Sequence, residues 1–308
     1  SIGNFNIESF QVSHSIPDSA GFIIRTSAGT IVHTGDFKID HTPIMGQHTD
    51  LNRLAEVGNE GVLLLCADST YAEIDGYTPS ETVVAERLEN AVSKAPGRII
   101  MTTFASLISR IQIIIDAAIK FDKRIFVTGR SMEKNIQISR DLGYISAPDQ
   151  VFMSRKEMRS FPPHKTIIIC TGSQGEPNAA LSRIARGTHQ YIEIQDGDTV
   201  VLSSNPVPGN EKSVSKNINL LFEAGADVIY NQIDNVHVRG HAAKEELKII
   251  HRIIKPKNFV PIHGEFRHLV HHAQLAINLG MEPENVFVLE DGDVLEINED
   301  YAEIPDHI

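Results

Sequence analysis

The sequence predicts an α/β protein in which one domain interrupts another, and two observations carry this prediction. Strand-like and helix-like segments alternate strictly from Thr78 to Tyr230, whereas the segments on either side of this stretch follow a different pattern. In the flanking segments, polar residues of chemical interest come directly after apolar strands. An α/β scaffold places its chemistry on the loops after its strands, so these polar residues are the first candidates for a site.

Composition limits the class of protein. Of 308 residues, 41% are apolar and 22% are charged, and no apolar run approaches the roughly 20 residues of a membrane span, so we expect no membrane association. Cys66 and Cys170 both lie in apolar runs, which favours two reduced core thiols and a cytoplasmic location. The net charge of −12 argues against a broad basic surface for nucleic acid. A narrow site can still be locally positive through metal ions, histidines and a few arginines.

The first part of the chain is predicted to form antiparallel strands followed by one buried strand. Alternating apolar residues and the turn at Ala28-Gly29 support strands at 10–13, 21–27, 30–33 and 61–67. His14, Asp36 and Asp68 each follow one of these strands.

The middle of the chain is predicted to form a mostly parallel sheet that is covered by helices. The run Thr78-Pro79-Ser80-Glu81 is a helix start with proline in the first turn. Strands are expected at 98–102, 124–128, 166–170 and 199–203, with helical stretches at 106–121, 132–142 and 212–224.

The last part returns to the first style. Helices are expected at 242–254 and 267–279, and strands at 259–262, 286–289 and 294–297. The simplest topology is one domain interrupted by another, with junctions near residues 78 and 236.

His14, Asp36 and His263 are the candidate metal ligands. Each follows a predicted strand, and the three come from well-separated parts of the chain. Two imidazoles and a carboxylate suit zinc or manganese, and a carboxylate can bridge two ions. Taken singly, a histidine is more often a structural or surface residue, and Gly35-Asp36 could equally form a turn.

Asp68, His237 and His241 are candidates for roles beside the metal, either orienting an imidazole or contacting a phosphate. Asp68 could cap the next turn, but we favour a role in orienting an imidazole through its second ring nitrogen. His237 and His241 have the spacing of a helical zinc pair, yet Gly240 favours a loop that leads into a helix. Such a loop suits contact with a phosphate, because helix N-termini offer free N–H groups and a favourable dipole.

Three strand-to-helix loops of the middle part could bind phosphates. The loop Thr171 to Pro177 is rich in small residues but lacks the Gly-Lys-Ser/Thr ending of a Walker loop. Candidate residues in the three loops are Gly172, Ser173, Gln174, Arg130, Ser131, Phe104 and Ser106. Phe104 could stack on a base, although a single phenylalanine at a strand end is more often part of the core. Closer to the end of the chain, the cluster His268, His271 and His272 is interpreted as a solvated helix face.

Six motifs together resemble those of the ribonuclease J family, in the β-CASP branch of the metallo-β-lactamase superfamily. They cover essentially the whole chain in the family's order and lie at 12–18, 33–38, 67–70, 171–177, 237–241 and 261–265. The resemblance implies an αββα metallo-β-lactamase sandwich, here partial, with an inserted β-CASP domain. Residues 1–77 and 237–308 would form the first and second parts of the metallo-β-lactamase domain, and residues 78–236 the β-CASP domain.

The resemblance also implies an activity: hydrolysis of RNA phosphodiesters with two divalent metal ions, Zn²⁺ and/or Mn²⁺. His14 would bind the first ion, Asp36 would bridge both and His263 would bind the second. His241 and His237 would hold the scissile phosphate, with His241 as proton donor and Asp68 as the family's acidic motif. His263 at the third motif is typical of RNA-directed members, and the seven loop residues named above would bind RNA. The implied functions are 5′-to-3′ exonuclease and endonuclease action in RNA processing and decay.

The implied partners are single-stranded RNA with a 5′ monophosphate, further copies of the full-length protein, and components of an RNA-decay complex. The family's His-x-His-x-Asp-His motif does not occur within these 308 residues, nor does its C-terminal domain. We therefore expect an incomplete metal site and an inactive isolated chain. Two alternatives stay open: a non-catalytic RNA-binding or assembly component with the same fold, and a DNA-directed nuclease of the same branch.

Overall fold

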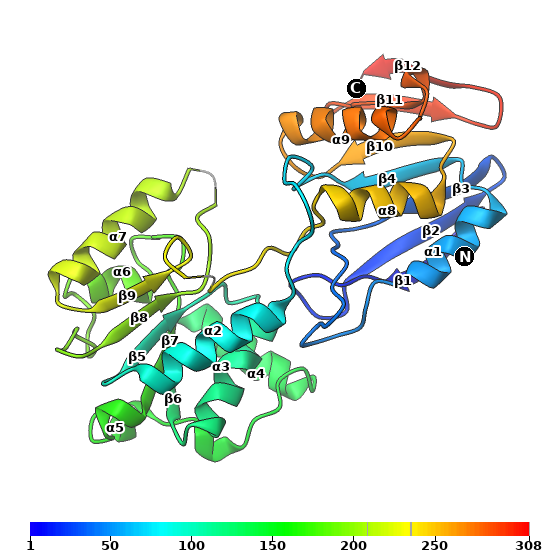
Figure 1. The fold of residues 1–308 in the computed structure, drawn as a ribbon. Helices are drawn as coiled ribbons and strands as arrows, with labels where there is room; N and C mark the ends of the chain where they lie inside the picture. Colours follow the sequence, from blue (N-terminus) through cyan, green and yellow to red (C-terminus); the bar gives the residue numbers. More distant parts are fainter. Residues whose placement is uncertain (208, 235, 308) are drawn as a thin grey trace. The chain divides into compact units, whose positions relative to one another are not determined.

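The computed structural model describes residues 1–207, 209–234 and 236–307, and residues 208, 235 and 308 lie outside the described residues. Two compact units divide the chain, each with its own sheet (Figure 1). Unit 1 comprises Ser1–His14, Asp18–Pro79 and Arg239–Ile308, and unit 2 comprises Ser15–Pro17 and Ser80–Val238. The junctions between the units fall after Pro79 and Val238, close to the junctions expected near residues 78 and 236.

Unit 1 is built on a five-stranded sheet of order β1-β2-β3-β4-β10. Its strands are β1 (Asn6–Gln11), β2 (Ala20–Thr26), β3 (Gly29–His33), β4 (Leu64–Asp68) and β10 (Asn258–Ile262). The β1–β2 and β2–β3 pairs are antiparallel, which confirms the antiparallel strands predicted for this segment. The β3–β4 and β4–β10 pairs are parallel.

One row of side chains across this sheet forms the centre of the core of unit 1. The register aligns Ile23 with Val32, Val32 with Leu65, and Leu65 with Phe259, and all four are fully buried. Three helices pack their apolar residues against this core: α1 (Leu51–Glu60), α8 (Lys244–Ile254) and α9 (Phe266–Asn278). Gly58 permits the close approach of α1 to α8, because a Cβ there would lie 2.2 Å from the carbonyl oxygen of Ile253.

The end of the described chain forms an antiparallel pair, β11 (Asp293–Ile297) and β12 (Ala302–His307). The strand predicted at 286–289 is wrong, because this run makes only a single bridge, between Val286 and Phe259, after a 3-10 turn at Pro283–Asn285. Val286 packs against the core of unit 1, so its apolar character reflects packing and not strand pairing.

Unit 2 is built on a five-stranded sheet of order β6-β7-β5-β8-β9 in which every described pair is parallel, as predicted. Its strands are β5 (Ile99–Thr102), β6 (Arg124–Thr128), β7 (Thr166–Cys170), β8 (Thr199–Leu202) and β9 (Asp227–Tyr230). Ile99, Ile100 and Met101 are consecutive and all fully buried. Burial of successive residues means that both faces of the sheet are covered, as is typical of parallel sheets.

Helices on both faces provide this cover (Figure 1). The helices α6 (Ala180–Ala185) and α7 (Glu211–Glu223) pack on the face that carries Ile100 and Val200. On the other side lie α2 (Glu81–Lys94), α3 (Ile108–Lys120) and α4 (Arg130–Asp141). The remaining short elements of unit 2 are α5 (Arg155–Met158) and 3-10 turns at Asp149–Val151 and Pro163–Lys165. The predicted helix start is confirmed at Ser80, whose side chain caps α2 by accepting a hydrogen bond from the N–H of Thr82, but Pro79 precedes the cap and does not lie in the first turn.

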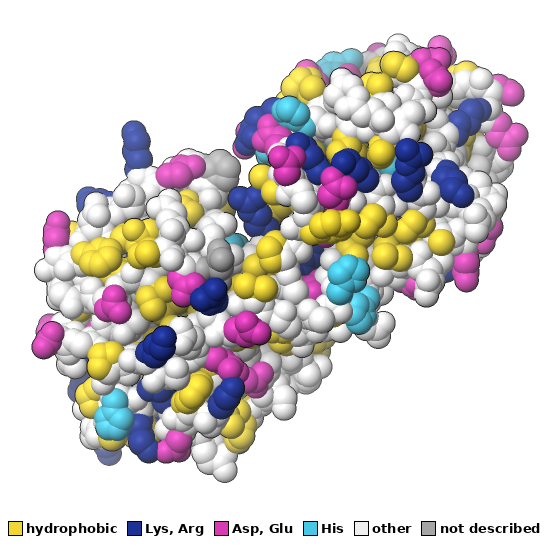
Figure 2. All heavy atoms as spheres, viewed as in Figure 1, with side chains coloured by type: hydrophobic (Ala, Val, Ile, Leu, Met, Phe, Trp, Pro, Cys, Tyr) yellow, Lys and Arg dark blue, Asp and Glu magenta, His cyan; other side chains and the backbone are white. Residues whose placement is uncertain are grey.

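The two cysteines and the mixed surface charges agree with what the composition predicts. Cys66 and Cys170 are free thiols, and burial raises their pKa values to about 11 and about 12. On the face in Figure 2, acidic side chains are interspersed with basic ones. Among the described residues, no helix has both the length and the apolar composition needed to cross a membrane.

Candidate functional site

Four candidate residues meet at one edge of the unit 1 sheet because four strands point the same way. β1 is antiparallel to β2 and β2 to β3, so β1 runs in the direction of β3, β4 and β10. His14 follows β1, Asp36 follows β3, Asp68 ends β4 and His263 follows β10. The carboxyl ends of these strands therefore deliver all four side chains to the same place.

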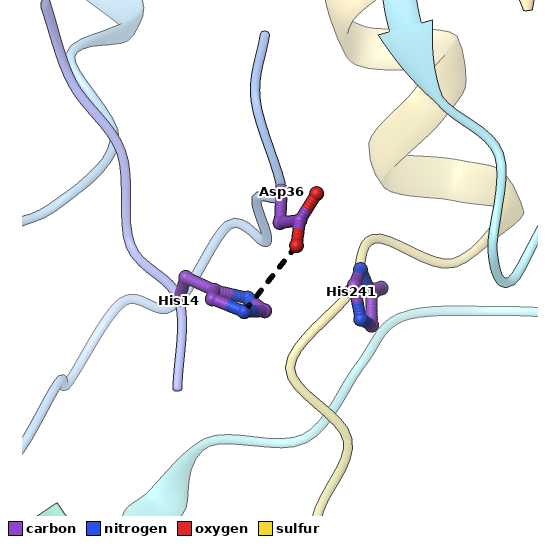
Figure 3. A group of neighbouring side chains, drawn as sticks. All are labelled: His14, Asp36 and His241. Atoms are coloured by element: carbon purple, nitrogen blue, oxygen red, sulfur yellow. Dashed lines mark ion pairs between the residues drawn. The ribbon is translucent and has the colours of Figure 1, made fainter. Parts of the chain in front are cut away.

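Asp36 lies between two imidazoles, one for each carboxylate oxygen. Its Oδ2 is 3.8 Å from Nε2 of His14, and its Oδ1 is 3.6 Å from Nε2 of His263. Figure 3 shows Asp36 reaching toward His14, with His241 across from them. Two ligand atoms of one tetrahedral zinc ion lie about 3.4 Å apart, given metal–ligand bonds of about 2.0–2.2 Å. The donor set therefore fits a carboxylate that bridges two ions, each with one imidazole.

The ring of His14 is set for ligation by its backbone contact. Nδ1 of His14 donates a hydrogen bond of 2.8 Å to the carbonyl oxygen of Gly240, which fixes the tautomer and turns Nε2 toward Asp36. Burial lowers the pKa of His14, although the bond to Gly240 opposes this shift. The neutral imidazole is the form that binds a metal.

His263 occupies a left-handed backbone conformation with φ of 57°. This conformation is uncommon for a residue with a Cβ and clusters at functional sites. Its carbonyl oxygen accepts a hydrogen bond of 3.2 Å from the N–H of Ser69, which ties the loop after β10 to the loop after β4. The side chain of His263 is 51% exposed, so this ring lies at the open side of the site.

Asp68 and His241 form a buried pair. Oδ2 of Asp68 lies 2.6 Å from Nδ1 of His241, while Oδ1 accepts hydrogen bonds from the N–H and the hydroxyl of Thr70 at 3.0 and 2.7 Å. Burial opposes ionisation of Asp68, yet the bonds from His241 and Thr70 hold its pKa below the usual value. An ionised carboxylate on Nδ1 leaves Nε2 of His241 as the atom for chemistry.

His241 also lies within reach of both halves of the metal site. A ring nitrogen of His241 groups with His14 and Asp36, and a second group joins it to Asp68 and His263, with all ligand atoms of each group within 4.8 Å. The sequence assigned His241 to phosphate handling and not to a metal. The geometry places His241 in both groups of side chains that could hold a metal ion.

Tyr71 and Arg239 border this site. Sequence reasoning missed Tyr71, whereas Arg239 lies within the 237–241 motif. The ring of Tyr71 packs against His241 with centroids 5.5 Å apart, and the Arg239 guanidinium lies 4.7 Å from the Tyr71 ring centroid. Burial raises the pKa of Tyr71. The available signal was the position of Tyr71 in the same loop as Asp68.

The interpretation of His268, His271 and His272 as a solvated helix face is wrong for His272. His272 is fully buried, with Nδ1 2.9 Å from the Ser69 hydroxyl and Nε2 3.2 Å from Nε2 of His251. The Ser69 hydroxyl donates to the carbonyl of Ala67, so it accepts from His272. His271 is exposed and pairs with Glu73.

The candidate phosphate-binding loops of unit 2 share the carboxyl edge of its parallel sheet. Phe104 and Ser106 follow β5, Arg130 and Ser131 begin α4 after β6, and Gly172–Gln174 follow β7. Arg130, Ser131 and Ser106 are exposed, and Phe104 is half-buried. Gly129 precedes α4 with φ of 113°, and a Cβ there would lie 2.6 Å from the Thr171 hydroxyl, so only glycine lets these loops approach.

A cavity of about 490 Å³ opens at this edge. Arg130, Ser131, Arg183 and His189 line it, together with Thr128, Gly129, Glu133, Thr171, Asn178, Ala180, Gln190 and Tyr191. Among the described residues, no side chain caps the N-terminus of α4 at the cavity, and an uncapped helix start suits the binding of an anion. Burial lowers the pKa of His189, and the charge of Arg183 adds to this shift.

The other candidates of unit 2 are placed less directly. Ser173 and Gln174 are buried, and the Gln174 side chain bonds to the carbonyl of Asn205 and the N–H of Val207 at 2.9 and 2.7 Å. The side chain of Gln174 therefore holds the shape of the loop. We still predict that the backbone N–H of Gln174 contacts an anion. His237 belongs to unit 2, where its N–H donates to the Asn231 side chain, and its partnership with His241 stays a prediction.

Two family models match the chain. The ribonuclease J β-CASP domain matches residues 96–221, and the Zn-dependent metallo-hydrolase RNA specificity domain matches residues 225–289. The second match contains His241 and His263.

The chain is similar to curated ribonucleases J over nearly its whole length. It is 48% identical over 297 residues to ribonuclease J of Helicobacter pylori (strain B128), covering 96% of this chain and 43% of that protein. It is 47% identical over 304 residues to ribonuclease J 1 of Streptococcus pyogenes, covering 99% and 54%. Ribonuclease J2 of Bacillus subtilis is 44% identical over 299 residues, covering 97% and 54%.

The fold is also found in a solved structure. A protein of unknown function from Enterococcus faecalis V583 superposes with a TM-score of 0.62 at 15% identity, covering 94% of this chain and 63% of that one. The chain spans about half the length of the curated relatives it matches. With its β-CASP and metallo-hydrolase matches and its metallo-β-lactamase/β-CASP fold, this chain belongs to the ribonuclease J family.

Proposed function

We propose that this chain is the central part of a metal-dependent ribonuclease of the ribonuclease J type. It would hydrolyse RNA phosphodiesters by 5′-to-3′ exonuclease and endonuclease action, in RNA processing and decay in the cytoplasm. The observation that carries the proposal is the placement of Asp36, whose two oxygens face Nε2 of His14 and Nε2 of His263 at 3.8 and 3.6 Å. Similarity to named ribonucleases J over nearly the whole chain supports the same proposal.

The residues of unit 1 would hold two ions, Zn²⁺ or Mn²⁺, in the proposed enzyme. His14 would bind one, His263 the other, and Asp36 would bridge them, with the remaining ligands supplied from outside these 308 residues. When bound, such ions supply Lewis-acid stabilisation of the charge that develops on a phosphodiester. Imidazole and carboxylate donors suit either metal.

His241 would donate the proton to the leaving group. Asp68 holds Nδ1 at 2.6 Å, so Nε2 is the atom that would contact the scissile phosphate and protonate the leaving oxygen. The pairing keeps the ring in one orientation, as a carboxylate does for the histidine of a catalytic triad. His237 is retained as a predicted phosphate contact.

The carboxyl edge of the unit 2 sheet would bind the RNA strand. Arg130, Ser131 and the N-terminus of α4 offer donors to phosphates, as do the backbone N–H groups of 172–174. Phe104 and Ser106 would contact bases and sugars. The substrate proposed here is single-stranded RNA with a 5′ monophosphate, and the full-length protein would act as a homo-oligomer with RNA-decay partners.

The test uses the full-length gene product and matched single strands of RNA and DNA, each with a 5′ monophosphate. We expect cleavage of RNA, loss of cleavage after metal chelation, and recovery with Mn²⁺ or Zn²⁺. Absence of cleavage in a protein that also binds no metal would support a non-catalytic RNA-binding component instead. Equal cleavage of DNA would support a DNA-directed nuclease.

A further inference from the structure

We propose that Glu246 is a positioning residue that fixes Asp36 relative to His241. The inference rests on the proposed function, since it concerns the same site. Glu246 lies in the first turn of α8, does not touch the candidate ligands' side chains in any described hydrogen bond, and is fully buried. Burial of a carboxylate is costly unless its oxygens are well satisfied by hydrogen bonds.

The carboxylate of Glu246 accepts three backbone N–H groups from three separate segments. Oε1 accepts from Ile39 at 2.7 Å, and Oε2 accepts from Thr78 at 2.6 Å and from Ala243 at 2.9 Å. The donors Ile39 and Thr78 lie 207 and 168 residues away in the chain. All of these residues belong to unit 1.

Two of the three segments carry the residues of the site. Ile39 lies three residues after Asp36, and Ala243 lies two residues after His241. The third segment adds a second link, because the Thr78 hydroxyl donates to the carbonyl oxygen of His241 at 2.6 Å. Glu246 is thus the point where the loops of Asp36 and His241 are joined.

The His14 segment is attached to the same assembly. The N–H of Lys38 donates to the carbonyl of Ser13 at 2.8 Å, and the Thr49 hydroxyl connects the two by accepting from Ser13 and donating to Lys38. Lys38 precedes Ile39, so the bond from Ile39 to Glu246 also bears on the position of His14.

A capping role alone does not account for this arrangement. A glutamate in the first turn commonly accepts the N–H of the residue at the helix start, and Glu246 does so with Ala243. A cap needs only that bond. The bonds from Ile39 and Thr78 join α8 to distant loops, which is how residues outside the ligand set orient a metal site.

The substitution Glu246→Gln tests one bond selectively. A glutamine has one acceptor oxygen where Glu246 has two, and its amide nitrogen cannot accept. The orientation that loses one bond and keeps two places the nitrogen opposite Ile39, because Oε2 serves both Thr78 and Ala243. We therefore expect the loop of Asp36 to be released while the start of α8 stays in place.

The matched control is Asp198→Asn. Asp198 is likewise buried and accepts from the Arg98 side chain and from the N–H of Gln195 at 2.9 Å, but it lies at the opposite, amino end of the unit 2 strands. Both variants remove one acceptor from a buried carboxylate. Only Glu246→Gln does so within the unit that carries the candidate metal site.

Three measurements are made on the full-length gene product. The first is amide hydrogen exchange at Ile39, Thr78 and Ala243. The second is the affinity for Co²⁺ alone with the absorption spectrum of the bound ion, and the third is kcat and KM for RNA cleavage. We expect Glu246→Gln to speed exchange at Ile39 in particular. It should weaken Co²⁺ binding and lower kcat, each by about 10- to 100-fold, and alter KM by less than about 3-fold. Asp198→Asn should leave Co²⁺ binding and kcat within about 2-fold of the wild type.

A wild-type Co²⁺ affinity and spectrum in Glu246→Gln, or an equal loss in Asp198→Asn, would overturn the proposal. Should Glu246→Gln not fold, Glu246→Asp replaces it. It keeps both acceptor oxygens but withdraws them by one methylene, so faster exchange is expected at Ile39, Thr78 and Ala243 together, with the same criteria for Co²⁺ binding and kcat. If the wild type cleaves no RNA, the proposed function fails, while exchange and Co²⁺ binding still decide the role of Glu246.

Discussion

Oδ2 of Asp68 lies 2.6 Å from Nδ1 of His241, although the two residues are 173 positions apart in the chain. Asp68 ends β4, and His241 lies on the loop before α8, so the pair joins the two parts of unit 1 on either side of the inserted unit. The carboxylate is almost fully buried, at 1% exposure, and thus acts in a medium where a charge-assisted hydrogen bond is strong.

The substitution Asp68→Asn should lower kcat by about 10- to 100-fold with a smaller effect on KM. The carboxylate serves His241 with one oxygen and Thr70 with the other, whereas the amide offers only one acceptor oxygen. Either Thr70 or the Nδ1–H of His241 therefore loses its acceptor. Steady-state cleavage of a 5′-monophosphorylated RNA measures the effect. The control is Asp122→Asn, which breaks an exposed ion pair with Lys165 and should leave kcat unaltered.

The substitution Asp36→Asn should weaken metal binding at both proposed ions by at least about 10-fold. An amide oxygen can bind one ion, but the amide nitrogen beside it is a poor ligand. Asparagine would therefore not link the proposed ion beside His14 to the proposed ion beside His263. Metal content after dialysis against a weak chelator gives the measurement. Asp75→Asn, an exposed carboxylate paired with Lys244, is the control and should retain its metal; equal retention by Asp36→Asn would contradict the bridging role.

The substitution Arg130→Ala should weaken RNA binding in a salt-dependent way. Loss of one phosphate contact reduces the slope of log affinity against log salt by about 0.7 for a single strand. Arg140→Ala is a control on the same helix, because Arg140 lies at the other end of α4 and pairs with Asp149. Fluorescence anisotropy across a salt series distinguishes the two, and identical slopes for both variants would place the RNA elsewhere.

Acid should destabilise the fold through His251 and His272. Burial lowers the pKa of His251 from 6.5 to about 4 and that of His272 well below 6.5. Because the folded pKa values are depressed, the unfolded chain takes up protons below about pH 6.5 that the folded chain does not bind. Stability is therefore full above pH 6.5 and falls as the pH drops toward 4, by about 1.4 kcal/mol per pH unit for each proton.

Urea unfolding of the metal-free protein between pH 7 and pH 4.5 measures this slope. A double variant, His251→Gln with His272→Gln, should show a shallower dependence on pH, whatever its stability at pH 7. The same slope in the double variant and the wild type would mean that other groups take up the protons.

His251 and His272 also show where the helical spacing of the sequence was misread. His272 lies three and four residues before Leu275 and Ala276, and His251 lies three before Ile254, so both share the buried face of their helices. Histidine was weighed as a polar residue, and the spacing to these apolar neighbours was the signal that would have corrected it. What the spacing could not supply is the hydrogen-bond partner Ser69, some 200 residues upstream of His272.

By itself the sequence determined most of the sheet strands and the polar residues that follow them. Apolar runs followed by His14, Asp36 and His263 predict a shared site, because strands that point the same way end at one edge. The tertiary structure alone decided which contacts those residues make. A carboxylate of Asp36 between two imidazoles, Asp68 on His241, and the three N–H groups on Glu246 all join residues far apart in the chain. Such pairings depend on register and burial, which local propensity does not contain, and they turn a set of candidate residues into an ordered site.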